Sequence, residues 1–347
     1  MYTIANASPH PGPLPTIAGR GSIFETAFST TRLVAALAFA LAASAWGQNF
    51  PVRPIRLVVP FPAGGTTDIN ARTLAAQLDR QLGHTVVVDN RVGANGIIAT
   101  ELVARSAPDG YTLLYVSSSI SLNPSTYRKL PYDTVKDFVP VTEAAAAVGF
   151  LLVVSPSLPA ASLRDLIALA KNADAKIAFG SPGYGNSLHL AAEVFKLRTG
   201  TQMLHVPYKG VAQALTATIA GEVQLAFMPP TIAVLQVKAG KARALVFTGP
   251  ARWALMPDVP TLSETIPGFV IAAGWDGMFA PARVPAHIVA RLQTEVNKAL
   301  QAPKVRDLFV SGGYEPVGST PDDFRKFFHA EMKRYADIVR DAKIQPE

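Results

Sequence analysis

Short apolar runs alternate along the chain with segments of helical periodicity. Residues 55 to 61, IRLVVPF, form a near-continuous apolar run, which is typical of a strand buried on both faces of a parallel sheet. Apolar side chains then recur at intervals of three and four residues, at Ala71, Leu74, Ala75, Leu78 and Leu82. This spacing predicts an amphipathic helix that ends at Gly83. Thr66, Thr67 or Asp68 can cap its start.

The same order of elements occurs twice. Strands are predicted next at 85 to 90 and 111 to 118, with a helix at 97 to 105 between them. A second copy begins at residue 176 with a strand, a glycine loop and a helix, in the stretch that opens KIAFGSPGYGNS. Its last three elements are a strand, a helix and a strand at 202 to 210, 211 to 221 and 223 to 230. The alternation predicts an α/β fold of two similar lobes, each a mostly parallel sheet flanked by helices.

Two extended stretches near prolines predict the crossings between the lobes. One is VGFLLVVS at 148 to 155, and the other is PGFVIAAGWDGMFAP at 267 to 281. Helices are predicted at 286 to 301 and 321 to 342, and we place this C-terminal segment against the first lobe. The predicted domains are then 48 to 148 plus 272 to 347 for the first lobe and 149 to 271 for the second.

The start of the chain has the pattern of a leader. Residues 33 to 45, LVAALAFALAASA, form an uncharged apolar run that follows Arg32 and ends in the triplet Ala43, Ser44, Ala45. This pattern predicts a secretory signal peptide within residues 1 to 47, because a membrane-spanning helix needs about 20 apolar residues. A buried core helix is the alternative. The sequence contains no cysteine, so we expect a periplasmic protein without disulfides or a lipid anchor.

The charge of the chain argues against nucleic-acid binding. The chain has 32 lysines and arginines against 25 aspartates and glutamates, a formal net charge of +7. The basic residues are scattered, so they predict a solvated surface and no nucleic-acid partner.

The glycine loops carry the candidate chemistry. PAGGTTD at 62 to 68 follows the first strand, and GSPGYGNS at 180 to 187 follows the corresponding strand of the second copy. Neither contains the lysine of a phosphate-binding loop or the G-x-G-x-x-G spacing of a dinucleotide site. Glycines at a helix start suit an anion site built from backbone N–H groups. The alternative is that they only make tight turns.

Hydrolysis and metal chemistry receive little support. Ser181 lies in F-G-S-P-G, and Phe179 breaks the G-x-S-x-G pattern of a nucleophile elbow. The six histidines show no metal-ligand spacing. We therefore expect no enzyme activity, no catalytic residue, no cofactor and no metal, and a periplasmic hydrolase is a remote alternative.

The stretches PIRLVVPFPAGGTTDINAR, VVVDNRVGANGIIATELVARSAPDGYTLL, FGSPGYGNSLHLAAEVFK and VPYKGVAQALTATIAGEV together resemble the solute receptors of tripartite tricarboxylate transporters, the Bug family. The resemblance extends from about residue 50 to 340. It implies a type II periplasmic-binding-protein fold, or Venus flytrap, that closes on a small organic acid. It also implies membrane permease subunits as partners, with a sensor kinase as the alternative. We expect a monomer.

The resemblance also implies ligand-binding residues. In the two loops these are Ala63, Gly64, Gly65, Thr66, Thr67, Asp68, Ser181, Gly183, Gly185, Asn186 and His189. The candidates at strand ends are Phe61, Ser117, Ser118, Tyr208 and Met228. Asp68 either caps the helix or contacts the ligand, and Phe61 and Tyr208 either stack on a ring or pack at strand ends. Met228 stands where the family often has an aspartate, so the sequence names no particular acid.

Overall fold

The computed structural model describes residues 3, 12 and 50 to 347. The predicted signal peptide lies outside the described residues. The chain divides into the units Met1–Phe50 and Pro51–Glu347, and the account below concerns the second unit. Within the described residues, no helix is both long enough and apolar enough to cross a membrane.

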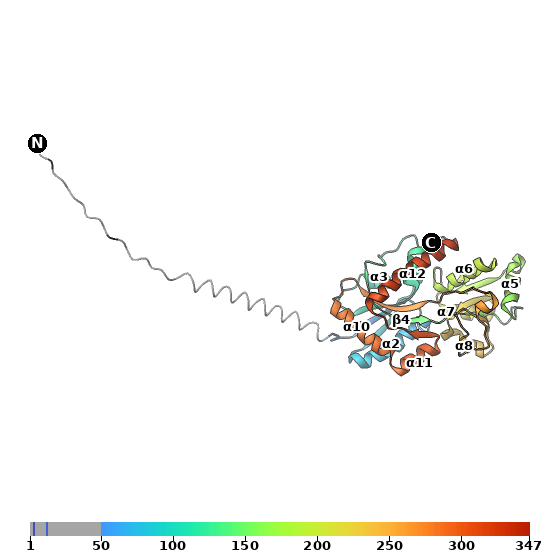
Figure 1. The fold of residues 1–347 in the computed structure, drawn as a ribbon, viewed down its shortest axis with the longest axis horizontal. Helices are drawn as coiled ribbons and strands as arrows, with labels where there is room; N and C mark the ends of the chain where they lie inside the picture. Colours follow the sequence, from blue (N-terminus) through green and yellow to red (C-terminus); the bar gives the residue numbers. More distant parts are fainter. Residues whose placement is uncertain (1–2, 4–11, 13–49) are drawn as a thin grey trace. The chain divides into compact units, whose positions relative to one another are not determined.

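Six strands form the first sheet, in the order β11-β4-β10-β3-β1-β2. Their bounds are β1 Ile55–Val59, β2 Val86–Asn90, β3 Thr112–Ser117, β4 Phe138–Ala147, β10 Trp275–Pro281 and β11 Tyr314–Pro316. The helices that pack with them are α2 Thr66–Leu82, α3 Ile97–Ala104, α4 Ser119–Thr126, α10 Ala286–Leu300, α11 Pro303–Ser311 and α12 Pro321–Asp341, with the short turn η1 Ala94–Gly96 before α3. We call this sheet and its helices the first lobe (Figure 1).

Five strands form the second sheet, in the order β7-β6-β8-β5-β9. Their bounds are β5 Leu151–Val154, β6 Ala178–Ser181, β7 Leu204–Pro207, β8 Leu225–Met228 and β9 Arg243–Phe247. The helical elements of this part are α5 Leu163–Lys171, η2 Ala173–Ala175, α6 Ser187–Thr199, α7 Val211–Ala220, α8 Pro230–Lys238 and α9 Leu262–Thr265. We call this part the second lobe. Its buried core joins β5, β6 and β8 to α5 and α6 through side chains such as Phe179, Phe195 and Phe227.

The two sheets repeat one arrangement, as the sequence predicts. In the first lobe β2, β1 and β3 are parallel, and in the second β7, β6 and β8 are parallel. An antiparallel strand follows in each, β10 beside β3 and β5 beside β8. The chain comes to each of these strands from the other lobe, and each strand runs opposite to its neighbour. The sheets are therefore mixed, whereas the pattern predicted mostly parallel ones.

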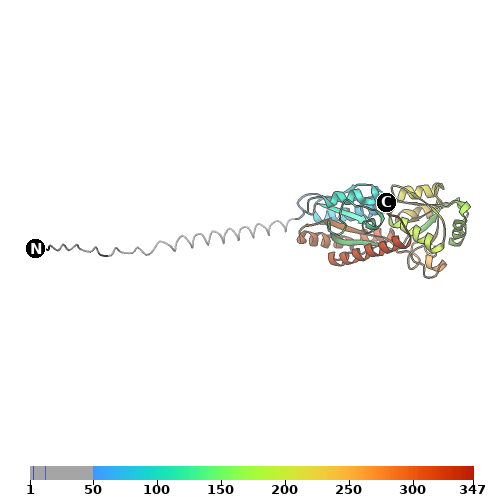
Figure 2. The same ribbon diagram turned by 90° about the horizontal axis from the view of Figure 1, so that it is seen from above.

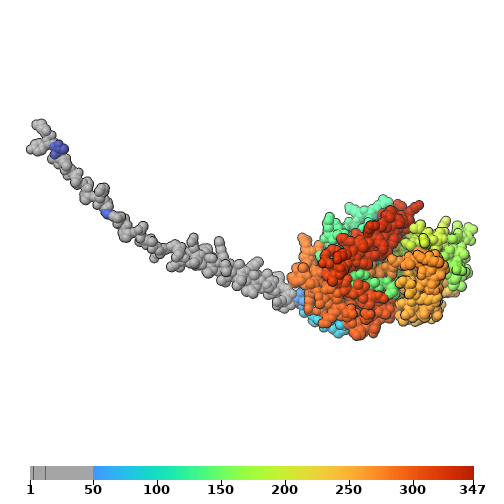
Figure 3. All heavy atoms as spheres, in the orientation of Figure 1, coloured from blue at the N-terminus to red at the C-terminus, as the bar shows by residue number. Residues whose placement is uncertain are grey.

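The C-terminal segment returns to the first lobe. Strand β10 lies between β3 and β4, and β11 pairs with β4. Figure 2 shows the orange and red C-terminal helices beside the blue and teal start of the unit. In Figure 3 the red helix α12 covers one face of this lobe. The predicted domain boundaries at residues 148 and 272 fall in the segments between the two sheets and stay a prediction.

Some local expectations need correction. Helix α2 begins with Gly65 as its N-cap, and no side chain caps it, so neither Thr66, Thr67 nor Asp68 is the N-cap residue. Strand β4 was not expected as a strand of its own, because its alanine-rich sequence FVPVTEAAAA has low strand propensity and forms through pairing with β10 and β11.

Candidate functional site

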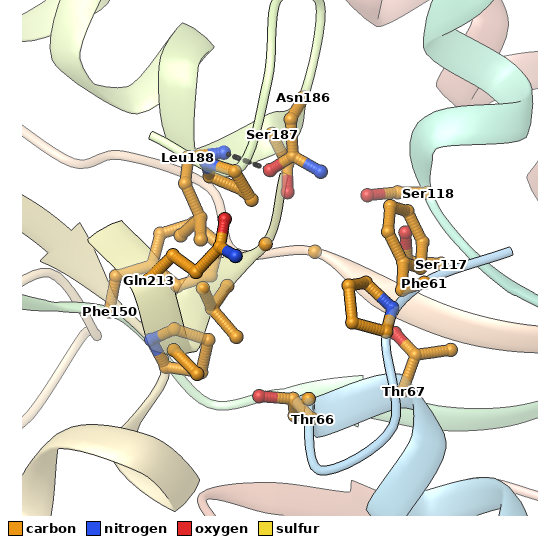
Figure 4. A pocket seen from close by; sticks show the side chains of 18 of the residues that line it. Phe61, Thr66, Thr67, Ser117, Ser118, Phe150, Asn186, Ser187, Leu188 and Gln213 are labelled. Atoms are coloured by element: carbon orange, nitrogen blue, oxygen red, sulfur yellow. Dashed lines mark hydrogen bonds between the residues drawn. The ribbon is translucent and has the colours of Figure 1, made fainter. Parts of the chain in front are cut away.

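A cavity of about 250 Å³ lies between the two lobes. Most of its wall follows the carboxyl ends of the parallel strands β1, β3, β6, β7 and β8, the place where ligands bind in α/β sheets. Figure 4 shows side chains of both lobes around one central space. The lining residues are Phe61, Pro62, Ala63, Gly65, Thr66, Thr67, Ser117, Ser118, Phe150, Pro182, Asn186, Ser187, Leu188, Gly210, Val211, Ala212, Gln213, Pro229, Gly274, Trp275 and Tyr314.

Five helices begin at this wall. The N-cap residues of α2, α4, α6, α7 and α8 all line the cavity, and they are Gly65, Ser118, Asn186, Gly210 and Pro229. The first turn of a helix leaves backbone N–H groups without a partner inside the helix, and the aligned peptide dipoles add a partial positive charge there. The caps of α2 and α7 make no side-chain hydrogen bond. The cavity therefore favours an anion.

The side chains around the cavity are neutral. Among its lining residues, all within the described part of the chain, there is no aspartate, glutamate, lysine, arginine or histidine. Its apolar surfaces come from residues such as Phe61, Phe150 and Trp275. An anion held here is thus stabilised by backbone N–H groups and hydroxyls, and its carbon skeleton meets apolar side chains.

Two hydroxyls at the wall are buried and unsatisfied. Thr66 Oγ1 and Ser118 Oγ make no hydrogen bond of good geometry in the structure. Ser118 does lie close to the Tyr335 hydroxyl; burial raises the pKa of Tyr335, and the contact with Ser118 opposes that rise. Thr66 is 5% exposed and stands at the first position of α2. Since a buried hydroxyl without a partner destabilises a protein, these two groups indicate a ligand that bonds to them.

Asp68 supports the first loop from behind. Its carboxylate accepts hydrogen bonds from Gly64 N at 2.9 Å, Asn90 Nδ2 at 2.8 Å and Arg72 Nε at 3.0 Å. Burial raises the pKa of Asp68, but the hydrogen bonds from Arg72, Asn90 and Gly64 outweigh it, so the pKa lies below its usual value. Asp68 is 1% exposed and does not line the cavity. Asp68 thus holds the loop before α2 through Gly64 N, and its side chain neither caps the helix nor faces the cavity.

A second buried carboxylate lies beneath the cavity. Asp276, the second residue of β10, accepts hydrogen bonds from Asn70 Nδ2 at 2.8 Å and Thr67 Oγ1 at 3.4 Å. Burial raises the pKa of Asp276 to about 6, although these two hydrogen bonds lower it. Through these two hydrogen bonds Asp276 connects the start of α2 to strand β10 of the first sheet. Thr67 in turn lines the cavity.

A stack of rings supports the second loop. The ring centroids of His189 and His205 lie 4.1 Å apart, with Phe179 at 4.9 Å from His205 and Tyr184 at 4.9 Å from His189. Ser181 Oγ lies 2.6 Å from His205 Nε2, and Gly185 N donates to His189 Nδ1 at 3.3 Å. Burial lowers the pKa of His189 to about 3 and that of His205 to about 4. Both rings are therefore neutral at pH 7 and fix the loop by hydrogen bonds.

The predicted site residues divide into two groups. Those that line the cavity are Phe61, Ala63, Gly65, Thr66, Thr67, Ser117, Ser118 and Asn186. Those that do not are Gly64, Asp68, Ser181, Gly183, Gly185, His189, Tyr208 and Met228. Met228 is fully buried in the second lobe, packed with side chains of β5 and α7. Tyr208 and Gly183 border a separate, more open depression beside the cavity.

Sequence reasoning missed a third loop. Gly210, Val211, Ala212 and Gln213 bring the start of α7 to the cavity. The available signal was the position of this helix after a predicted strand, the same place that the two glycine loops occupy. Phe150, Gly274 and Trp275 come from the two crossings, and no local pattern marked them.

The comparisons with known proteins agree with this geometry. Residues 70–344 match the model of the tripartite tricarboxylate transporter family receptor, TctC. The chain belongs to this receptor family. It is 38% identical over 319 residues to protein BugT of Bordetella pertussis, a match that covers 90% of this chain and 97% of BugT.

Two solved structures are similar in fold and sequence. Rpa4515 of R. palustris, solved with adipate, has a TM-score of 0.82 and 36% identity, covering 86% of this chain and all of that one. MatC of Rhodopseudomonas palustris, solved with malate, has a TM-score of 0.76 and 30% identity, covering 84% and 100%. The TctC chain is accordingly a periplasmic solute-binding receptor, and the predicted two-lobed fold is confirmed. Its family and neighbours are binding proteins and not enzymes.

Proposed function

We propose that this TctC receptor captures a small organic acid between its lobes and delivers it to the permease of a tripartite tricarboxylate transporter. The observation that carries the proposal is the convergence of five helix starts on one neutral cavity. This arrangement compensates a carboxylate without a charged side chain. The relatives solved with adipate and malate support the same ligand class.

The proposed mechanism is binding without chemistry. A ligand that contacts α2 and α4 in the first lobe and α6 and α7 in the second gains all its contacts only when the lobes are closed. Its preference for the closed state then shifts the population toward closure. We propose Phe61, Thr66, Thr67, Ser118 and Asn186 as the side chains of the predicted set that meet the ligand.

Isothermal titration calorimetry with adipate and malate tests this proposal. We expect saturable binding of at least one of these acids, and a loss of binding for the corresponding uncharged diamide, because the helix starts favour negative charge. Equal affinity for the acid and its diamide would contradict the proposed anion site.

Thr66→Val is expected to change stability and affinity in opposite directions. Valine has the shape of threonine without the unsatisfied hydroxyl, so the free energy of unfolding of the ligand-free protein should rise by about 1 kcal/mol. Affinity for the acid should fall about tenfold, because one hydrogen bond to the ligand is lost. Urea unfolding and calorimetry measure the two effects.

Thr73→Val in the same helix is the matched control. The Thr73 hydroxyl donates to Ile69 O at 2.8 Å and is not part of the cavity. This substitution should leave the affinity unchanged, and an equal loss of affinity in both variants would argue against a ligand contact at Thr66.

The transport role and the export route are tested separately. We propose periplasmic export by the N-terminal leader, which predicts a mature N-terminus near residue 48 in Edman sequencing of the exported protein. Ligand uptake in cells that express the permease of a tripartite tricarboxylate transporter should require this receptor. Uptake that is normal without the receptor, together with a ligand-dependent change in a sensor kinase, would favour the signalling alternative.

A further inference from the structure

The loop between β2 and α3 has an unusual backbone. Four consecutive residues have positive φ: Gly93 at 144°, Ala94 at 45°, Asn95 at 47° and Gly96 at 90°. Two of these are not glycine, and residues other than glycine adopt this conformation only at a cost in free energy. Such a backbone conformation persists when surrounding contacts stabilise it. The contacts of Asn95 in this loop come from both lobes.

Asn95 connects the two lobes through its side-chain amide. Asn95 Nδ2 donates to Gly185 O of the second lobe at 2.6 Å and to Asn123 Oδ1 of its own lobe at 2.9 Å. Asn95 Oδ1 accepts from Asn186 Nδ2 of the second lobe at 3.4 Å. Both N–H groups and the oxygen of this amide are thus in use, and two of its three partners lie across the cleft.

The partners of Asn95 place it behind the ligand cavity. Asn186 is the N-cap of α6, and its own Oδ1 accepts from Leu188 N at 3.0 Å. Asn186, Ser187 and Leu188 all line the cavity, whereas Asn95 does not. Asn95 therefore fixes the start of α6 against the first lobe without contributing to the cavity wall.

The backbones approach closely at the same place. A Cβ atom added to Gly185 would lie 2.5 Å from Thr126 Oγ1 of α4 in the first lobe, so only glycine fits there. Gly185 also has a φ of +65°. The contact between Asn95 and Gly185 O thus requires the two loops to meet closely, and any separation of the lobes breaks it.

We propose that Asn95 is a positioning residue that latches the closed arrangement of the lobes. Its two cross-lobe hydrogen bonds stabilise closure through contacts that do not involve the ligand, and the local backbone of residues 93 to 96 presents the amide to the second lobe. The effect on affinity rests on the proposed binding function, whereas the effect on lobe closure does not.

Asn95→Gly tests the latch while sparing the backbone, since glycine adopts positive φ freely. Because the chain contains no cysteine, Val87→Cys on β2 and Leu204→Cys on β7 give two unique spin-label sites, 49% and 69% exposed in the native side chains. Pulsed electron spin resonance measures the distances between the two spin labels. The ratio of short distances, from closed molecules, to long distances, from open molecules, then reports lobe closure. Lys176→Gly, at another position with a φ of 45° but in the second lobe away from the cavity, is the matched control.

In Asn95→Gly we expect the short-to-long ratio to fall about tenfold, because the latch bonds are lost in the closed state only. The dissociation rate of adipate should rise by about the same factor with little change in the association rate. The melting temperature of Asn95→Gly should stay close to that of the wild type. The Lys176→Gly control should match the wild type in its distance ratio and in the dissociation rate of adipate.

The measurement is made without added acid and with excess adipate. Equal distance ratios in the wild type and Asn95→Gly under both conditions overturn the latch, and so does an equal loss in Lys176→Gly. If adipate neither binds nor changes the wild-type distances, the proposed ligand class fails. A lower ratio in Asn95→Gly without added acid would still support the latch in that case.

Discussion

Gly65→Val is expected to lower the affinity for the organic acid about ten- to a hundredfold while the protein stays folded. Gly65 is the N-cap of α2 and has a φ of −77° and a ψ of 164°, which valine adopts without strain. Its added Cβ would lie 3.2 Å from Pro62 O and 3.8 Å from Val211 Cγ2 of the second lobe. The two methyl groups beyond it would enter the space between the starts of α2 and α7. Overpacking by this amount costs about 1–3 kcal/mol in the closed state, which the open state does not pay.

Calorimetry and thermal unfolding together test this prediction. Gly65→Ala, which adds only the Cβ atom, should show an intermediate affinity. Ala286→Val adds bulk at the exposed first residue of α10 and should leave affinity unchanged. A Gly65→Val protein with wild-type affinity would mean that the lobes do not close on the ligand at α2.

The stacked pair His189 and His205 should make the protein sensitive to acid. Both rings are neutral in the folded protein, since burial lowers the pKa of His189 to about 3 and of His205 to about 4, from an ordinary value near 6.5. Repulsion from His205 contributes to the lowered pKa of His189, and repulsion from Lys196 contributes to both lowered values. Glu193 Oε1 lies 3.7 Å from His189 Nε2. Below pH 6.5 the unfolded chain binds protons that the folded protein does not. The histidine contribution to stability is therefore present above pH 6.5 and is lost as the pH falls toward 4 and 3.

The expected loss between pH 7 and 4.5 is on the order of 4 kcal/mol for the pair. Two buried carboxyls act in the opposite direction. Burial raises the pKa of Asp276 to about 6 and, with repulsion from Glu331, that of Glu143 to about 7. Their protonation stabilises the folded protein as the pH falls through 7 and 6, so the net pH dependence of the wild type alone does not isolate the histidines.

The double variant His189→Asn/His205→Gln isolates them. Asparagine and glutamine offer acceptor and donor groups at positions similar to Nδ1 and Nε2 but do not titrate, while Asp276 and Glu143 are unchanged. Urea unfolding at pH 7 and 4.5 should show that the wild type loses several kcal/mol relative to the double variant at the lower pH. Parallel pH dependence in the two proteins would mean that the histidines are protonated in the fold or are not coupled to it.

The sequence alone predicted the repeated order of strands, loops and helices. This was possible because buried parallel strands and amphipathic helices have local patterns that need no knowledge of the partner lobe. It also placed the first glycine loop at the cavity between the lobes, because loops at the carboxyl ends of parallel strands share one edge of the sheet. Phe61, Gly65, Thr66 and Thr67 all line the cavity.

Only the tertiary structure decided which side chains of the second loop reach the cavity. Ser181 and His189 belong to the same motif as Asn186, yet they turn into the ring stack behind the loop. Met228 ends a strand at the correct edge but points into the core. The reason is that side-chain direction at a strand end depends on what packs on each face of the sheet. The place of the α7 start at the cavity depends on how the lobes meet, and so does the contact of Asn95 with Gly185. A contact between residues 90 positions apart has no local signature in the sequence.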